Sequence, residues 1–135
     1  LVLHRRNNIN PTCRLVGHSI NTSTSDVLPT TSYIKLERDG EMLEEVAIGS
    51  GPVDAAYKAI NRMLGMDVRL ESFSLNAVTD GEDAIAEAVV KVASGGESYT
   101  GTGLSTDILE SSIRAYVNGI NKIIEAGTAP EEGRE

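Results

Sequence analysis

An internal repeat is the feature that most constrains the fold of this 135-residue chain. In the first half, a strand candidate leads into Asp39-Gly40, a dipeptide that favours a two-residue hairpin turn, and a second strand candidate returns from it. In the second half, Lys91 and Gly96 recur with the same spacing as Lys35 and Gly40. The sequence therefore predicts one hairpin-containing unit that is built twice.

Each predicted hairpin is preceded by one more strand candidate, at residues 14–20 and 68–78. Each hairpin is followed by an apolar stripe at helical spacing, which begins at Val53 in the first half and at Leu109 in the second. We therefore predict the α+β class, with tandem β-β-β-α repeats whose two helices pack on one side of a mostly antiparallel sheet. The other sheet face is left for solvent or for association.

The two units are expected at about residues 13–65 and 66–127. Residues 1–12 show no periodicity and are interpreted as a linker or an expression remnant. The polar residues 128–135 are interpreted as a disordered tail. Because the chain begins with Leu1 rather than with methionine, we expect it to be a fragment of a longer protein.

The strand candidate that opens the second unit changes its apolar face partway along. Val68 and Leu70 alternate on one face, whereas Phe73 and Leu75 fall on the other. A strand with one face in water should keep its apolar residues on the same side. Either a bulge lies near Glu71, or both faces are covered, which in so small a unit would require a second subunit or a ligand.

Glycines precede both predicted helices. Gly49 and Gly51 predict a tight turn, and Pro52 suits the first helical position because its missing N–H would be unpaired there. The segment around Gly103 is expected to open the second helix in the same way, with Ser105 as its cap. Such turns direct free backbone N–H groups at one point, where the carboxylate of a small zwitterion could bind.

Composition narrows the classes of function. A formal net charge of −8 argues against a nucleic-acid partner, and no apolar run approaches the roughly 18 residues of a membrane span. The single cysteine, Cys13, rules out an intrachain disulfide and fits a reducing cytoplasm. His4 and His18 are not spaced as metal ligands, and no set of nucleophile and base is evident. The sequence thus predicts a binding module with no catalytic residue and no metal ligand.

At this point the residues resemble a known family. Residues 49–60, from the glycine turn into its helix, are similar to the signature of the C-terminal regulatory domain shared by 2-isopropylmalate synthase and citramalate synthase. Residues 76–84, 101–108 and 112–121 resemble further motifs of that domain in the same order. The resemblance covers about residues 14–124.

The resemblance implies a homodimer that binds a branched-chain amino acid where the subunits meet. It also implies feedback inhibition of a metal-dependent barrel of the same protein, which condenses acetyl-CoA with a 2-oxo acid. Without that barrel, the fragment is expected to hold no cofactor and to catalyse nothing. The leading hypothesis is leucine sensing by 2-isopropylmalate synthase, which uses 2-oxoisovalerate. The alternatives are a citramalate synthase domain that senses isoleucine and a purely structural dimerisation domain without a ligand.

The resemblance also implies an effector site. The polar end of the effector is expected to meet the backbone around Gly49, Ser50, Gly51, Val53 and Asp54. Its aliphatic side chain is expected to lie among Leu70, Phe73, Ala77, Ala84 and Leu104. Apart from the resemblance, Asp83 follows a predicted turn and is a candidate to receive the effector's ammonium group.

Overall fold

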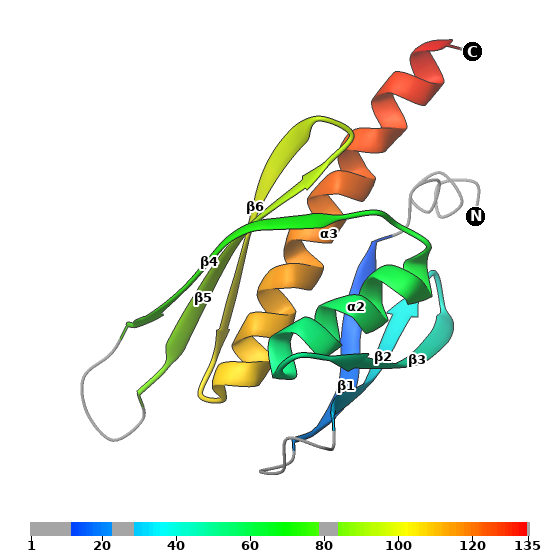
Figure 1. The fold of residues 1–135 in the computed structure, drawn as a ribbon. Coiled ribbons are helices and arrows are strands. Elements are labelled where there is room, and N and C mark those ends of the chain that lie inside the picture. The colour runs from blue at the N-terminus through cyan, green and yellow to red at the C-terminus, as the bar shows by residue number, and fades with distance from the viewer. Residues whose placement is uncertain (1–11, 23–28, 79–83, 135) are drawn as a thin grey trace.

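The computed structural model describes residues 12–22, 29–78 and 84–134, with side chains as far as residue 127 (Figure 1). Its elements are β1 (Cys13–Asn21), β2 (Thr30–Arg38), β3 (Glu41–Gly49), α2 (Pro52–Leu64), β4 (Arg69–Ala77), β5 (Ala86–Ser94), β6 (Glu97–Ser105) and α3 (Ile108–Arg134). The predicted α+β class and the β-β-β-α order of both repeats are confirmed.

The strands form two separate three-stranded antiparallel sheets, β1-β2-β3 and β4-β5-β6, rather than one sheet. Each strand pairs with its neighbour in sequence, so each repeat completes its own sheet and the chain leaves it through a helix. Helix α2 packs on β2 and β3, and α3 packs on β5 and β6. The prediction of helices on a mostly antiparallel sheet thus holds within each repeat.

Both hairpins turn through two residues in the left-handed region. Asp39 and Gly40 have φ values of 56° and 82°, and Gly95 and Gly96 have values of 62° and 85°. Two consecutive positive φ values are the signature of a type I′ turn, whose twist matches that of the flanking strands. The hairpin predicted from Asp39-Gly40 is therefore confirmed, and the second repeat has its equivalent.

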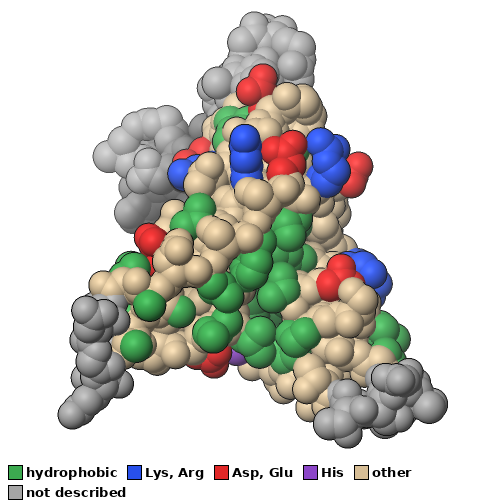
Figure 2. Space-filling model, turned by 60° about the vertical axis from the view of Figure 1, so that its left-hand side comes forward, with side chains coloured by type: hydrophobic (Ala, Val, Ile, Leu, Met, Phe, Trp, Pro, Cys, Tyr) green, Lys and Arg blue, Asp and Glu red, His purple; other side chains and the backbone are tan. Residues whose placement is uncertain are grey.

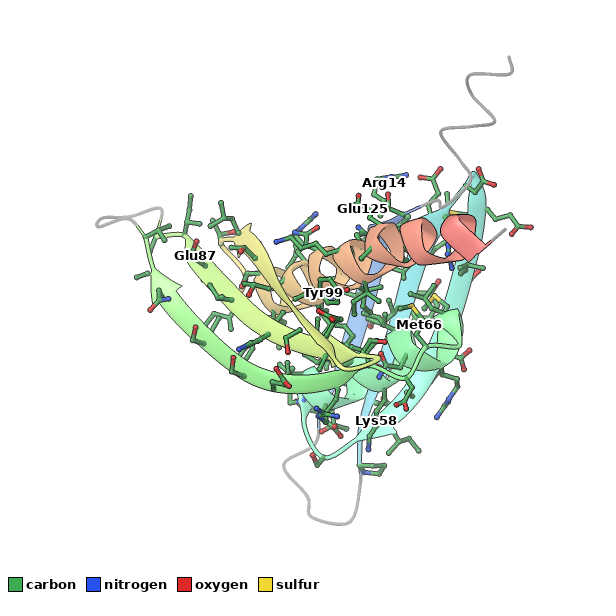
Figure 3. The ribbon with its side chains drawn as sticks, turned by 90° about the horizontal axis from the view of Figure 1, so that it is seen from above. Arg14, Lys58, Met66, Glu87, Tyr99 and Glu125 are labelled. Atoms are coloured by element: carbon green, nitrogen blue, oxygen red, sulfur yellow. The ribbon has the colours of Figure 1, made fainter. Side chains whose placement is uncertain are left out.

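A bulge accounts for the change of face in β4. The register of β4 against β5 shifts between Leu70 and Ser72, so the bulge alternative is confirmed. The register of β1 against β2 shifts at the equivalent place, between Leu15 and Gly17. Every residue of β4 is exposed within the single chain, so two-sided burial does not occur in one protomer. Figure 3 shows β4 at the outer edge of its curved sheet, away from α3.

The second glycine pair has a different role from the predicted one. Gly101 and Gly103 lie inside β6 and do not form a turn. A Cβ atom at Gly101 would lie 2.1 Å from the Ala115 carbonyl oxygen, and one at Gly103 would lie 2.3 Å from the Ser111 carbonyl oxygen. Glycine is required at both positions because α3 crosses β6 too closely for any side chain. The predicted turn at this position is therefore wrong.

The cap of α3 also differs from the prediction. The N–H groups of Leu109 and Glu110 donate to Oδ1 of Asp107, at 2.8 and 3.4 Å. Ser105 is the last residue of β6, and its hydroxyl accepts the Asp107 N–H at 3.0 Å. Asp107 is thus the capping residue, because β6 continues two positions further along the chain than a turn at Gly103 would allow.

The apolar core lies between the helices and the inner sheet faces. Its largest fully buried apolar side chains are Ile34, Leu36, Ile60, Val90, Val92, Ile113, Tyr116 and Ile120. Helix α3 continues through Arg134 and so includes residues that the sequence analysis assigned to a polar tail. Among the helices of the described segments, none has the length and apolar character needed to cross a bilayer.

Candidate functional site

The glycine turn ahead of α2 is bound by a carboxylate of the chain itself. Gly51 is the N-cap residue in extended backbone (φ −159°), and Pro52 occupies the first turn of the helix as predicted. No side chain of the described residues caps this helix end. The Ser50 N–H donates a hydrogen bond of 2.8 Å to Oδ2 of Asp54. A ligand carboxylate at Ser50 would displace Asp54, whereas the remaining amides of the first turn keep the partial positive charge of a helix N-terminus.

Gly49 brings the end of β3 into close contact with α2. A Cβ atom at this position would lie 2.4 Å from the backbone nitrogen of Ala55 and 2.7 Å from Oδ2 of Asp54. Any side chain would therefore push the strand and the helix apart. The junction of β3 and α2 brings together the predicted residues Gly49, Ser50, Gly51, Val53 and Asp54.

A cavity of about 410 Å³ opens between α2 and the start of β4. This volume lies in the range typical of sites for small molecules. The cavity is lined by Val53, Asp54, Tyr57, Lys58, Asn61, Val68, Leu70 and Tyr116. Its walls are therefore mostly aliphatic and aromatic, with one acid and one base among them. Three of the predicted effector residues, Val53, Asp54 and Leu70, belong to this α2–β4 cavity.

The acid and the base of the cavity form an ion pair one helical turn apart. Lys58 Nζ lies 3.2 Å from Oδ2 of Asp54, and the two side chains are 57% and 40% exposed. Figure 3 shows Lys58 on the outer side of α2. The pKa of the Asp54 carboxyl is lowered, first by the hydrogen bond from the Ser50 N–H and then by Lys58. A cation and an anion at one edge of an apolar cavity match the two charges of an amino-acid zwitterion.

Two stacked tyrosines form the buried wall of the cavity. The rings of Tyr57 and Tyr116 have centroids 3.8 Å apart and planes inclined by 9°. The Tyr116 hydroxyl donates to Oδ1 of Asn61 at 2.6 Å, and Asn61 Nδ2 donates to the Val68 carbonyl at 3.1 Å. Burial raises the pKa of Tyr116 to about 12 and also raises that of Tyr57, so both hydroxyls stay protonated near neutral pH. These contacts connect α2, α3 and Val68, the residue that precedes β4.

The other predicted effector residues lie elsewhere on the protomer. Ala77 and Ala84 border a second hollow of about 300 Å³, near the end of β4 and the start of α3. Leu104 lines a third hollow of about 370 Å³ between β1, β6 and α3. Phe73 is exposed on β4, and Asp83 lies outside the described residues. One chain therefore brings only part of the predicted set into one cavity.

Several residues that line the α2–β4 cavity were not predicted from the sequence. They are Tyr57, Lys58, Asn61, Val68 and Tyr116. The helical pattern assigns Tyr57 only to the core stripe. Lys58 carried a usable signal, because it follows Asp54 by four residues and so lies on the same helix face. Tyr116 carried none, since it comes from the other repeat.

Comparison with known proteins gives a consistent assignment. The sequence model of the LeuA allosteric (dimerisation) domain matches residues 3–124. A 2-isopropylmalate synthase from Carboxydothermus hydrogenoformans is 53% identical over 103 residues, which are 76% of this chain and 20% of that protein. The 2-isopropylmalate synthase of Salmonella agona is 41% identical over 119 residues, 88% of this chain and 22% of that protein.

A third relative extends the comparison. The 2-isopropylmalate synthase of Pyrococcus furiosus is 42% identical over 95 residues, 70% of this chain and 19% of that protein. The chain spans about a fifth of the length of these curated relatives. The matched region includes all six strands, α2, most of α3 and the whole α2–β4 cavity. The chain therefore belongs to the family of LeuA allosteric (dimerisation) domains.

Proposed function

We propose that this chain is the part of a 2-isopropylmalate synthase that binds leucine and transmits feedback inhibition to the catalytic barrel of the same protein. The observation that carries the proposal is the α2–β4 cavity, which combines apolar walls with a paired acid and base. The family match and the similarity to 2-isopropylmalate synthases support the enzyme context. The condensation of acetyl-CoA with 2-oxoisovalerate by a metal-dependent barrel, in the cytoplasm, belongs to the same proposal.

Leucine would break the ion pair at the cavity edge, and its own two charged groups would pair with the separated partners. Its carboxylate pairs with Lys58 and with the uncapped amides at the start of α2, and its ammonium group pairs with Asp54. Its isobutyl group lies against Val68 and Leu70, where it removes apolar surface from water. This pose uses Val53 and Asp54 from the predicted polar set and Leu70 from the predicted apolar set.

A second copy of the chain would complete the site. Leu70, Phe73 and Leu75 on β4 are 39%, 37% and 40% exposed, which is unusual for three apolar residues of one strand. Figure 2 shows hydrophobic side chains gathered on the face that comes forward from the left of Figure 1, where β4 lies. We infer that this face contributes to the dimer, because the family is described as a dimerisation domain. Phe73 and Ala77 would then reach the effector from the partner side.

Feedback inhibition follows if leucine binds one arrangement of the dimer better than another. An effector can shift an equilibrium only through its different affinities for the two states. Leucine in the α2–β4 cavity contacts both the helix of the first repeat and the first strand of the second repeat. Its binding would therefore fix the position of β4 relative to α2, and through the β4 face the arrangement of the two subunits.

Calorimetric titration with leucine, isoleucine and valine tests the proposal. We expect one saturable site per protomer, with leucine binding most tightly. The Asp54→Asn and Lys58→Met variants should each weaken leucine binding at least tenfold, because each removes one charge that the zwitterion needs. Lys122→Met, an exposed residue on α3, is the matched control and should bind as wild type. No heat from any of the three amino acids at millimolar concentration would contradict the proposal and favour a structural dimerisation domain.

The identity of the preferred amino acid separates the two sensing functions. A tenfold preference for isoleucine over leucine would assign the chain to a citramalate synthase instead. The two ligands differ in the position of one methyl group, which is worth about 1–3 kcal/mol in an apolar pocket.

A further inference from the structure

A histidine from the first repeat and two carboxylates from the second repeat converge away from the α2–β4 cavity. His18 lies in β1, Asp107 caps α3, and Glu110 lies in the first turn of α3. One ring nitrogen of His18 and one oxygen of each carboxylate all lie within 4.8 Å of one another. The cluster could not be predicted from the sequence, because its members lie far apart along the chain.

The histidine lacks the partner that a buried polar atom normally has. Nδ1 of His18 is buried and makes no hydrogen bond. Among the described residues, it is the one buried side-chain nitrogen or oxygen that lacks a hydrogen-bond partner. Buried polar atoms are nearly always paired, so an orphaned one points to a missing ion or water. Neutral imidazole is also the commonest metal ligand among side chains. The bulge between Leu15 and Gly17 lies just before His18, and His18 borders the same hollow as Glu110 of α3.

The two carboxylates are held by other contacts that each occupy one oxygen. Asp107 Oδ1 accepts the Leu109 N–H at 2.8 Å, and Glu110 Oε2 accepts from Nε of Arg114 at 2.8 Å. These bonds orient both carboxylates and leave Oδ2 and Oε1 for another partner. Hydrogen bonds to carboxylate ligands are typical around metal ions and orient those ligands.

We propose that His18, Asp107 and Glu110 bind one divalent transition-metal ion, with water completing its coordination. One imidazole nitrogen and two carboxylate oxygens form a donor set suited to Zn²⁺. Tetrahedral ligands about 2.1 Å from an ion lie about 3.4 Å from each other, so side-chain rotations are enough to close the site. The positive end of the α3 dipole opposes a cation, but Oδ1 of Asp107 already faces those amides.

The proposed ion would join the two repeats. His18 belongs to the first sheet, and the two carboxylates lie at the start of α3 in the second repeat. One bound ion would therefore link β1 to α3. A ligand that binds only the folded chain raises its stability. This site is separate from the α2–β4 cavity, and its occupancy does not depend on the proposed leucine binding.

Titration of this chain with Zn²⁺ alone, followed by calorimetry and by thermal unfolding with and without EDTA, tests the proposal. We expect one ion per chain and a higher unfolding temperature with Zn²⁺. His18→Gln and Asp107→Asn should each weaken binding at least tenfold. Asp107→Asn is the sharper variant, because asparagine caps a helix as well as aspartate does and so keeps the fold.

Two control variants separate this site from adventitious binding. Glu125→Gln changes an exposed carboxylate elsewhere on α3, and His4→Ala removes the other histidine. Both should bind Zn²⁺ as wild type does. The proposal is overturned if wild type binds no Zn²⁺ at millimolar concentration. It is equally overturned if His18→Gln and Asp107→Asn bind it as tightly as wild type.

Discussion

Strands β1 and β4 open the two repeats in the same way but end in different surroundings. Each is held at its start by an asparagine from a helix, and each has a bulge at the same place. At that start, Cys13 and Val68 are both 6% exposed. Two positions later, Leu15 is 9% exposed, whereas Leu70 is 39% exposed. Helix α3 reaches across to β1, while the main contacts of β4 are with β5.

The two helices also differ in length. Helix α3 has 27 residues and α2 has 13. Helix α2 ends where Gly65 adopts the left-handed conformation (φ 63°), a common way to terminate a helix. The short helix covers only its own sheet and leaves β4 uncovered. The apolar residues of β4, the first strand of the second repeat, thus remain available for a ligand and a second subunit.

Glycine substitutions at the crossings of strand and helix should have the largest effect. Gly103→Ala would place a Cβ atom 2.3 Å from the backbone of α3. We expect it to lower the free energy of unfolding by about 3 kcal/mol, because the helix and β6 must separate. Gly49→Ala should lower the free energy of unfolding by a similar amount, since its Cβ atom would lie 2.4 Å from the backbone nitrogen of Ala55. Urea unfolding measures both, with Gly17→Ala, which has open space, as the control. Equal stability of all three variants would contradict the close packing.

Replacing the two asparagines that hold β1 and β4 should lower stability by similar amounts, but only one of the two substitutions should affect leucine binding. Asn61→Ala leaves the Tyr116 hydroxyl and the Val68 carbonyl without their partner. Asn121→Ala leaves the backbone N–H and carbonyl of Cys13 without theirs. We expect each to cost about 2 kcal/mol of stability, measured by urea unfolding. Only Asn61→Ala should also weaken leucine binding. If Asn121→Ala weakened it as much, the cavity would not be the site.

The exposed face of β4 should control subunit association. Phe73→Glu places a charge among Leu70 and Leu75, and we expect it to shift the dimer toward monomer at least tenfold. Val16→Glu makes the same kind of change at an exposed apolar residue of β1 and should leave the dimer intact. Analytical ultracentrifugation over a concentration series distinguishes the two variants. A stable Phe73→Glu dimer would place the interface elsewhere.

The smallest expected effect concerns the pH dependence of stability. The pKa of Asp54 is lowered in the folded chain, so the unfolded chain binds more protons there. Its stabilising contribution is complete above the unfolded pKa of about 3.9 and is lost as the pH falls through the lower folded value. Asp54→Asn should reduce the loss of stability in acid and change stability at pH 7 by less than about 1 kcal/mol. Thermal unfolding between pH 7 and pH 2 checks this, and unchanged acid sensitivity would count against the assignment.

Local signals in the sequence were sufficient for the elements and for one irregularity. The Asp39-Gly40 turn and the face change around Glu71 depend on adjacent residues, and both predictions are confirmed. Gly101 and Gly103 were misinterpreted because a glycine pair suits a turn and a close helix crossing equally well. Only the tertiary packing of α3 decides between them.

Non-local features were beyond the sequence pattern. The start of α2 was predicted from its glycines and Pro52, but the cavity beside it requires Tyr116 from the other repeat. The division into two sheets depends on which strands pair in space. The resemblance to a known family supplied a list of site residues, and the structure divides the described ones among the β3–α2 junction, three hollows and the β4 surface.

Hydrogen exchange of the β4 amides, with and without leucine, tests the contrast between the two strands most directly. We expect leucine to slow exchange at residues 69–77 at least tenfold and to leave residues 13–21 unchanged, because β1 is already covered by α3. Unchanged exchange in β4 at saturating leucine, or equal slowing in both strands, would contradict the account.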